Sequence, residues 1–135
     1  MKRRMISILC VLCLVVAMLP PVTASAAAPT TLTVGGTNVL GGGCWTTDGS
    51  GKLTATDSTT DYNVKYDSAT GTLTLKDATI NGTDTIGHVG TGIYAEGDLT
   101  IVLEGSSTVT GVQDPNGDSQ SIRVSGNLTI QGGGS

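Results

Sequence analysis

Short runs of alternating apolar and polar residues dominate the second half of the chain. The clearest run places Leu99, Ile101 and Leu103 at every second position, and the runs at 93–96 and 108–110 alternate in the same way. A period of two residues is typical of a β-strand with one buried face. Glycine-containing segments separate the runs and supply residues that favour turns. The pattern therefore predicts a series of short strands joined by tight corners.

The runs also repeat along the chain. Five pairs of like residues lie 29 positions apart: Ile80 and Val109, Gly82 and Gly111, Ile93 and Ile122, Gly97 and Gly126, and Leu99 and Leu128. Two more pairs, Leu73 with Ile101 and Leu75 with Leu103, lie 28 positions apart. A repeat of this length that preserves residue type indicates supersecondary units stacked head to tail.

This repeat predicts an all-β solenoid over residues 72–135, with coils of about 28–29 residues and three short strands in each coil. Each strand is expected to pair in parallel with its equivalent one coil later, so that Leu99 lies under Leu128 and Tyr94 under Arg123. An antiparallel sandwich is the alternative, because it also has short strands at this spacing. It does not explain the repeat, and we therefore favour the solenoid.

Residues 27–71 have a different pattern. Leu32 to Val39 reads as a hairpin that turns at Gly35-Gly36, and residues 64–75 read as a second hairpin. We expect this segment to form an antiparallel cap over the first edge of the solenoid, because an uncovered edge pairs readily with other chains.

Residues 1–26 are predicted to be an export signal. A basic start at 2–4 precedes an apolar stretch at 5–19, and small residues at 24–26 match a cleavage site. The apolar stretch is short for a membrane span, although a retained anchor is the alternative. Cleavage would leave no membrane span and would leave Cys44 as the single cysteine, expected to be a buried apolar residue beside Trp45.

Composition and charge restrict the possible partners. The chain has 20 glycines and no phenylalanine, which disfavours a helical protein. Residues 27–135 hold four basic and eleven acidic side chains, a net charge of −7. Such a surface repels phosphate backbones, so nucleic acid is not expected as a partner.

About two coils follow the predicted cap before the chain stops at its glycine-rich end, 132–135. Solenoids usually need three or more units to bury their core. We therefore expect further coils, or a partner chain, at the C-terminal edge.

A family resemblance rests on four segments: VGGTNV, YDSATGTLTLKDATING, GIYAEGDLTIVLEGSSTVTG and SIRVSGNLTIQGGGS. They resemble the β-helical surface proteins of Gram-positive gut and cellulolytic bacteria, some of which are carbohydrate-binding and pectate-lyase-like. The resemblance implies a right-handed parallel β-helix, a secreted or cell-surface location, binding of polysaccharide without cleavage, and in some members calcium. Its motifs are generic, so no ligand residue carries over from the family by position.

Two groups of residues are candidates for binding. Asp114, Asn116 and Asp118 match the start of a calcium loop, although the later positions of that motif are missing and a solvated turn is the alternative. Tyr94, Glu96 and Arg123 would meet on the outer face of stacked strands, where an exposed aromatic ring and polar groups can hold a sugar. An ordinary solvated face, with Arg123 over the Tyr94 ring, is the alternative.

No catalytic set is recognisable in the sequence. His88 is the single histidine, and it lies in a glycine-rich connection. We therefore expect a non-catalytic, exported β-helical module that binds extracellular polysaccharide. The first alternative is a structural stalk or adhesin segment without a small ligand, and the second is a polysaccharide lyase.

Overall fold

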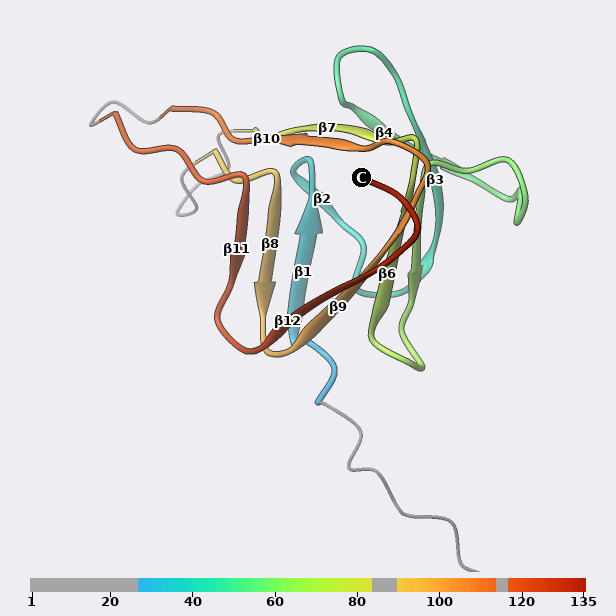
Figure 1. The fold of residues 1–135 in the computed structure, drawn as a ribbon, viewed down its shortest axis with the longest axis horizontal. Coiled ribbons are helices and arrows are strands. Elements are labelled where there is room, and N and C mark those ends of the chain that lie inside the picture. Colours follow the sequence, from blue (N-terminus) through green and yellow to red (C-terminus); the bar gives the residue numbers. More distant parts are fainter. Residues whose placement is uncertain (1–26, 84–89, 114–116) are drawn as a thin grey trace, which may run out of the picture.

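The structure is a computed structural model that describes residues 27–83, 90–113 and 117–135. The described residues form twelve strands in three sheets and no helix, which confirms the all-β prediction (Figure 1). The predicted export signal, residues 1–26, lies outside the described residues. The strands are β1 (Thr31–Val34), β2 (Thr37–Asn38), β3 (Gly43–Thr47), β4 (Leu53–Thr56), β5 (Val64–Asp67), β6 (Thr72–Lys76), β7 (Thr79–Asn81), β8 (Ile93–Glu96), β9 (Leu99–Glu104), β10 (Thr108–Thr110), β11 (Ile122–Val124) and β12 (Leu128–Gly132).

From β6 onward, each strand that has a partner three places later pairs with it in parallel. The pairs are β6 with β9, β7 with β10, β8 with β11 and β9 with β12. Leu99 lies opposite Leu128 and Ile93 opposite Ile122, which confirms the register predicted from the repeat. In Figure 1 the three sheets surround a shared interior.

Two aspartates tie the corners of successive repeats together. Asp77 Oδ1 accepts a hydrogen bond from the backbone N–H of Ser106 at 2.9 Å. Asp98 Oδ1 accepts one from the N–H of Asn127 at 2.7 Å. Both bonds join residues 29 positions apart, the same interval that separates the paired apolar residues. The corners therefore fix the same register as the strands.

Both predicted N-terminal hairpins are present. β1 and β2 pair antiparallel around Gly35 and Gly36, which have φ values of 53° and 75°. Such positive φ values at both central positions match the twist of a two-residue hairpin and favour glycine. β5 and β6 form the second antiparallel hairpin.

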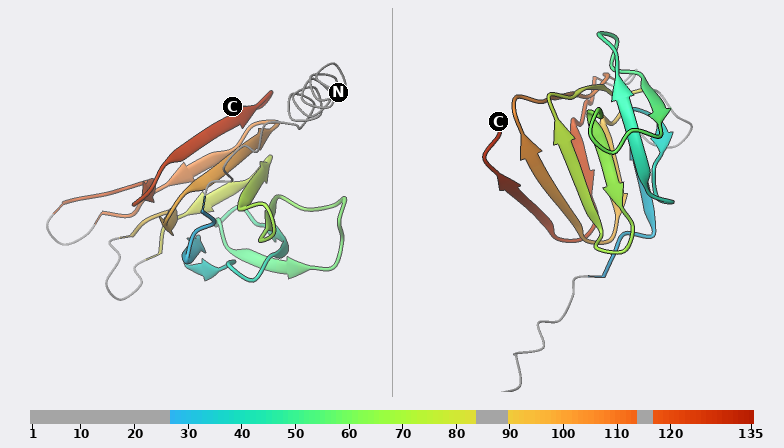
Figure 2. Two further views of the ribbon diagram at one scale, coloured as in Figure 1. Left: turned by 90° about the horizontal axis from the view of Figure 1, so that it is seen from below. Right: turned by 90° about the vertical axis from the view of Figure 1, so that its right-hand side faces the viewer.

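The sequence did not predict the remaining N-terminal pairings. β3 and β4 form a third hairpin, and β3 also pairs with β5. β1 pairs antiparallel with β8, so the first hairpin extends the sheet that contains β8 and β11. Figure 2 (left) shows these N-terminal strands at one end of the molecule and β12 at the other.

The interior is almost entirely aliphatic. It is built from Val39, which follows β2, and from the inward positions of all three sheets: Leu32, Val34, Leu53, Val64, Leu73, Leu75, Ile80, Ile93, Leu99 and Ile101. Trp45 and Tyr66 are buried as well, whereas Tyr62 is half-buried near the ammonium groups of two lysines. Cys44 is only half-buried, so its predicted burial beside Trp45 is wrong. Trp45 alternates with Cys44 along β3 and takes the inward position, which leaves Cys44 on the opposite face.

The apolar pattern continues to the last strand, but the burial does not. Leu99 and Ile101 on β9 are each 1% exposed, whereas their partners on β12, Leu128 and Ile130, are 41% and 53% exposed. A cavity of about 220 Å³ also lies at this end, with Ile130 in its lining. The described residues therefore present an apolar surface beside β12.

Candidate functional site

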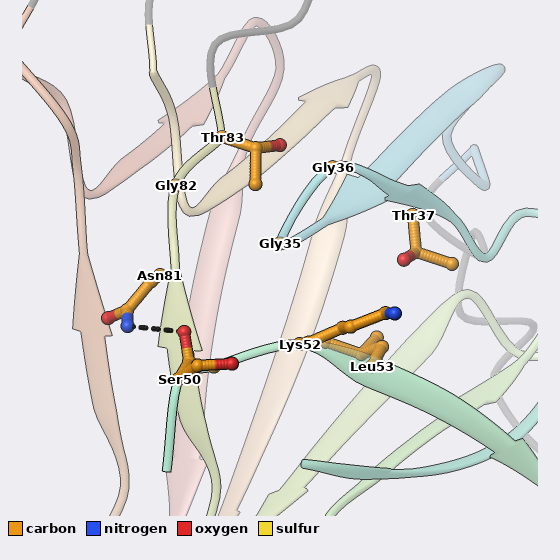
Figure 3. A pocket seen from close by; sticks show the side chains of 10 residues that line it. Gly35, Gly36, Thr37, Ser50, Lys52, Leu53, Asn81, Gly82 and Thr83 are labelled. Atoms are coloured by element: carbon orange, nitrogen blue, oxygen red, sulfur yellow. Dashed lines mark hydrogen bonds between the residues drawn. The ribbon is translucent and has the colours of Figure 1, made fainter. Parts of the chain in front are cut away.

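A hollow with polar lining groups lies where the turns of two hairpins meet the end of β7. The Gly35-Gly36 turn, the β3–β4 turn and the end of β7 enclose a cleft of about 430 Å³ (Figure 3). Its lining residues are Gly35, Gly36, Thr37, Ser50, Gly51, Lys52, Leu53, Asn81, Gly82 and Thr83. We call this hollow the polar cleft.

The β3–β4 turn owes its shape to Asp48. The carboxylate oxygen Oδ1 accepts hydrogen bonds from Ser50 Oγ at 2.6 Å, Ser50 N at 2.9 Å and Lys52 N at 3.1 Å. An aspartate that folds back onto the following backbone in this way is typical of tight turns. The hydrogen bond from the Ser50 side chain, followed by that from the Lys52 backbone, holds the pKa of Asp48 below its usual value. Asp48 is therefore a structural anion that positions Ser50 and Lys52 at the cleft.

Glycines allow the two turns and the end of β7 to approach one another closely. Gly51 has a φ of 80°, and a Cβ added there would lie 2.5–2.9 Å from atoms of Asn81. Asn81 in turn donates a hydrogen bond from Nδ2 to the Ser50 carbonyl at 2.7 Å, shown as the dashed line in Figure 3. The β3–β4 turn is thus attached directly to the end of β7.

This arrangement can bind a polar ligand. Thr37, Ser50, Asn81 and Thr83 bring hydroxyl and amide groups to the cleft, and Lys52 brings a positive charge to an otherwise acidic chain. The glycines leave backbone groups accessible, and Leu53 adds an apolar patch. A few polar groups around a small apolar surface suit a hydroxyl-rich ligand.

Sequence reasoning did not find the polar cleft. It recognised the Gly35-Gly36 turn, but nothing in the sequence placed the segment 48–51 beside that turn. Neither segment carries a binding motif, so only the pairing of the strands could show that the turns meet.

The predicted sugar-binding residues do come together. Tyr94 lies opposite Arg123 in the parallel β8–β11 pair, and the guanidinium carbon is 5.9 Å from the centre of the ring. The Tyr94 hydroxyl donates a hydrogen bond to Glu96 Oε1 at 2.7 Å, and Thr31 Oγ1 donates one to Glu96 Oε2 at 2.8 Å. The predicted neighbours of Tyr94 are therefore correct.

The predicted exposure of the Tyr94 ring is wrong. Tyr94 is 6% exposed. Its strand, β8, is flanked by β1 on one side and β11 on the other, with Thr33 and Arg123 as its paired residues. The sequence suggested only the β11 neighbour. A ring with so little accessible surface offers no face on which a sugar could stack.

The predicted calcium loop falls largely outside the described residues. Asp114 and Asn116 lie in the segment 114–116, and Asp118 is exposed beside it. His88 also lies outside the described residues. Within residues 27–83, 90–113 and 117–135, no group of three or more His, Cys, Asp or Glu side chains is placed to hold a metal ion.

Comparison of the chain with protein-family models, curated proteins and solved structures finds no match. Among the described residues there is no helix of the length and hydrophobicity needed to cross a membrane.

Proposed function

We propose that this chain is an exported, right-handed parallel β-helix module that binds extracellular polysaccharide without cleaving it. The parallel pairing of β6, β7, β8 and β9 with the strands three places later supports the solenoid architecture. The sequence pattern at residues 1–26 supports export. The resemblance to carbohydrate-binding β-helical surface proteins supports the choice of ligand.

The polar cleft is the single observation that carries the binding proposal. Its volume of about 430 Å³ suits one or two sugar rings, and its walls present hydroxyl, amide and backbone groups. Lys52 adds a cation that can pair locally with a carboxylate. At a salt concentration that screens the repulsion from the net charge of −7 on residues 27–135, we therefore expect acidic glycans to bind better than neutral ones. The Tyr94, Glu96 and Arg123 group has no role in this proposal, because the Tyr94 ring is buried.

Retention on insoluble glycans tests the proposal. We expect retention on cross-linked polygalacturonate and weaker retention on cellulose. Lys52→Gln should reduce the affinity for polygalacturonate about three- to tenfold, since it removes one charge-assisted contact. Lys65→Gln is the matched control, because Lys65 lies on β5 and outside the cleft lining, and it should bind as the wild type does.

The assay distinguishes the other outcomes as well. Equal loss of binding in both lysine variants would show that net charge, and not the polar cleft, determines binding. Retention that requires calcium would support the predicted loop at Asp114, Asn116 and Asp118. Release of unsaturated uronic ends, detected by ultraviolet absorbance, would contradict the non-catalytic part of the proposal and favour a lyase.

A structural stalk or adhesin segment is the second candidate function. It is supported by the aliphatic stacking of successive repeats and by the inaccessible Tyr94 ring. Failure of the chain to bind any glycan in the panel would favour this role.

A further inference from the structure

The last strand of the largest sheet has the features of an interface. Within the part of the chain that the structure describes, β12 stands at the edge of its sheet and pairs only with β9. Figure 2 (right) shows β12 at that outer edge. One row of its backbone N–H and C=O groups therefore faces away from the sheet, beside the exposed side chains of Leu128 and Ile130.

The β12 edge lacks two of the features that keep edge strands apart. Edge strands are usually protected by charged side chains, by proline or by a bulge. Residues 124–135 contain no charged side chain and no proline, although the whole chain has a net charge of −4. Two copies of this edge can therefore approach without the repulsion that other parts of the surface would produce.

The sequence of β12 is also complementary to itself. If two copies pair antiparallel with Thr129 on the two-fold axis, Leu128 lies opposite Ile130 of the second copy, and Asn127 lies opposite Gln131. Directly opposite residues point to the same face of a sheet, so the Leu–Ile pairs fall on the inner face. The Thr–Thr and Asn–Gln pairs fall on the outer face, where their side chains can form hydrogen bonds. A shift by one residue would place inward apolar residues opposite outward polar ones.

We propose that a second copy of this chain binds at the C-terminal end, through antiparallel pairing of the two β12 strands in the register centred on Thr129. The pairing extends each six-stranded sheet into the other copy and covers Leu128 and Ile130. It also places the second copy over the end at which the 220 Å³ cavity lies. The resulting contact is isologous, as in most homodimers.

The positions of β10 and β11 favour a whole second copy, and not an isolated peptide strand, as the partner of β12. Each is also the last strand of its sheet among the described residues, and each belongs to the same repeat as β9. Among the described residues, the other two sheets therefore end on the same side of the molecule as β12, one strand earlier. A second copy brings its own β10 and β11 to this side as well, whereas a single peptide strand would cover β12 alone.

The oligomeric state of the exported protein, purified from the medium of a secreting host, tests this proposal. Light scattering during size exclusion between about 1 and 100 μM should show a dimer at the higher concentrations. Ile130→Lys should shift the protein to a monomer, because two charges would be buried opposite Leu128 of each partner. Val112→Lys is the control, because Val112 is 43% exposed but lies outside β12, and it should remain dimeric.

Cross-linking tests the register without relying on the lysine variants. In a Cys44→Ser background, Thr129→Cys should form an intermolecular disulfide under mild oxidation, since its counterpart lies directly opposite. Gln131→Cys should not cross-link, because the residue opposite it is Asn127. A protein that is monomeric from about 1 to 100 μM overturns the proposal. The β12 edge would then be available for pairing with a further repeat. A dimer in which Gln131→Cys cross-links as readily as Thr129→Cys overturns the register.

Discussion

Glu96 links two strands of the outer face through its two carboxylate oxygens. One oxygen accepts the Tyr94 hydroxyl and the other accepts the Thr31 hydroxyl, so the carboxylate bridges β8 and β1. The guanidinium carbon of Arg123 on β11 lies 5.9 Å from the centre of the Tyr94 ring. The group that the sequence suggested as a sugar platform is therefore a structural contact between strands that are distant in the chain.

This contact predicts a pH dependence. The hydrogen bond to Glu96, and then burial, raise the pKa of Tyr94 above its usual value. A raised pKa means that the folded state favours the protonated hydroxyl of Tyr94. The protonated hydroxyl therefore stabilises the fold fully below the pKa of tyrosine in the unfolded chain, about 10. This stabilisation is lost as the pH rises through the pKa of Tyr94 in the folded protein. The free energy of unfolding should therefore fall in this alkaline range.

Tyr94→Phe should make the alkaline fall shallower. Urea unfolding between about pH 8 and 11, together with tyrosinate absorbance, measures the effect. Tyr66 should continue to titrate late in this variant, since burial raises its pKa independently of Tyr94. If the free energy of unfolding of Tyr94→Phe falls as steeply with pH as that of the wild type, Tyr94 is not the cause of the alkaline loss of stability.

Among the elements, the repeating strands were the most predictable. Leu99 and Leu128 could be paired from the sequence because parallel stacking places like residues on one another, and this leaves a regular interval in the chain. The Gly35-Gly36 hairpin was predictable because its turn requires positive φ.

β3 and β4 could not be predicted in the same way. Threonines occupy much of both strands, and four of the five residues of β3 and three of the four of β4 are not fully buried, so apolar alternation is weak. Their pairing depends on the Asp48 turn and on contact with β5, which is not local. The polar cleft shares this origin, since it exists only where the turns of separate hairpins meet.

The turn between β3 and β4 offers a matched pair of substitutions. Gly51→Ala should destabilise the protein by about 1–3 kcal/mol, because alanine is strained at positive φ and its Cβ would press against Asn81. Gly49→Ala in the same turn meets nothing within 4 Å and should change stability by less than about 1 kcal/mol. Urea unfolding followed by the fluorescence of Trp45, the single tryptophan, measures both. Equal effects would show that Gly51 is not constrained by the end of β7.

For the whole molecule, the interior depends on aliphatic residues that stack from one repeat to the next. Ile101 lies in the middle layer, between Leu73 on β6 and Ile130 on β12. Ile101→Ala should lower the free energy of unfolding by about 2–5 kcal/mol, as expected when a buried side chain leaves a cavity. Val112→Ala, at an exposed position, should cost about 0.5 kcal/mol or less. A similar loss in both variants would argue against a packed middle layer.

The corner aspartates have a consequence for how such a protein can grow. Asp77 and Asp98 each bond forward to a residue 29 positions later, and contacts of this kind join only adjacent layers. A tandem duplication of residues 98–126, inserted after Gly126, would supply one more layer with its own corner aspartate and its own aliphatic rows. The lengthened molecule would keep both of its original ends, so a single genetic event could extend the fold without a new design for its core.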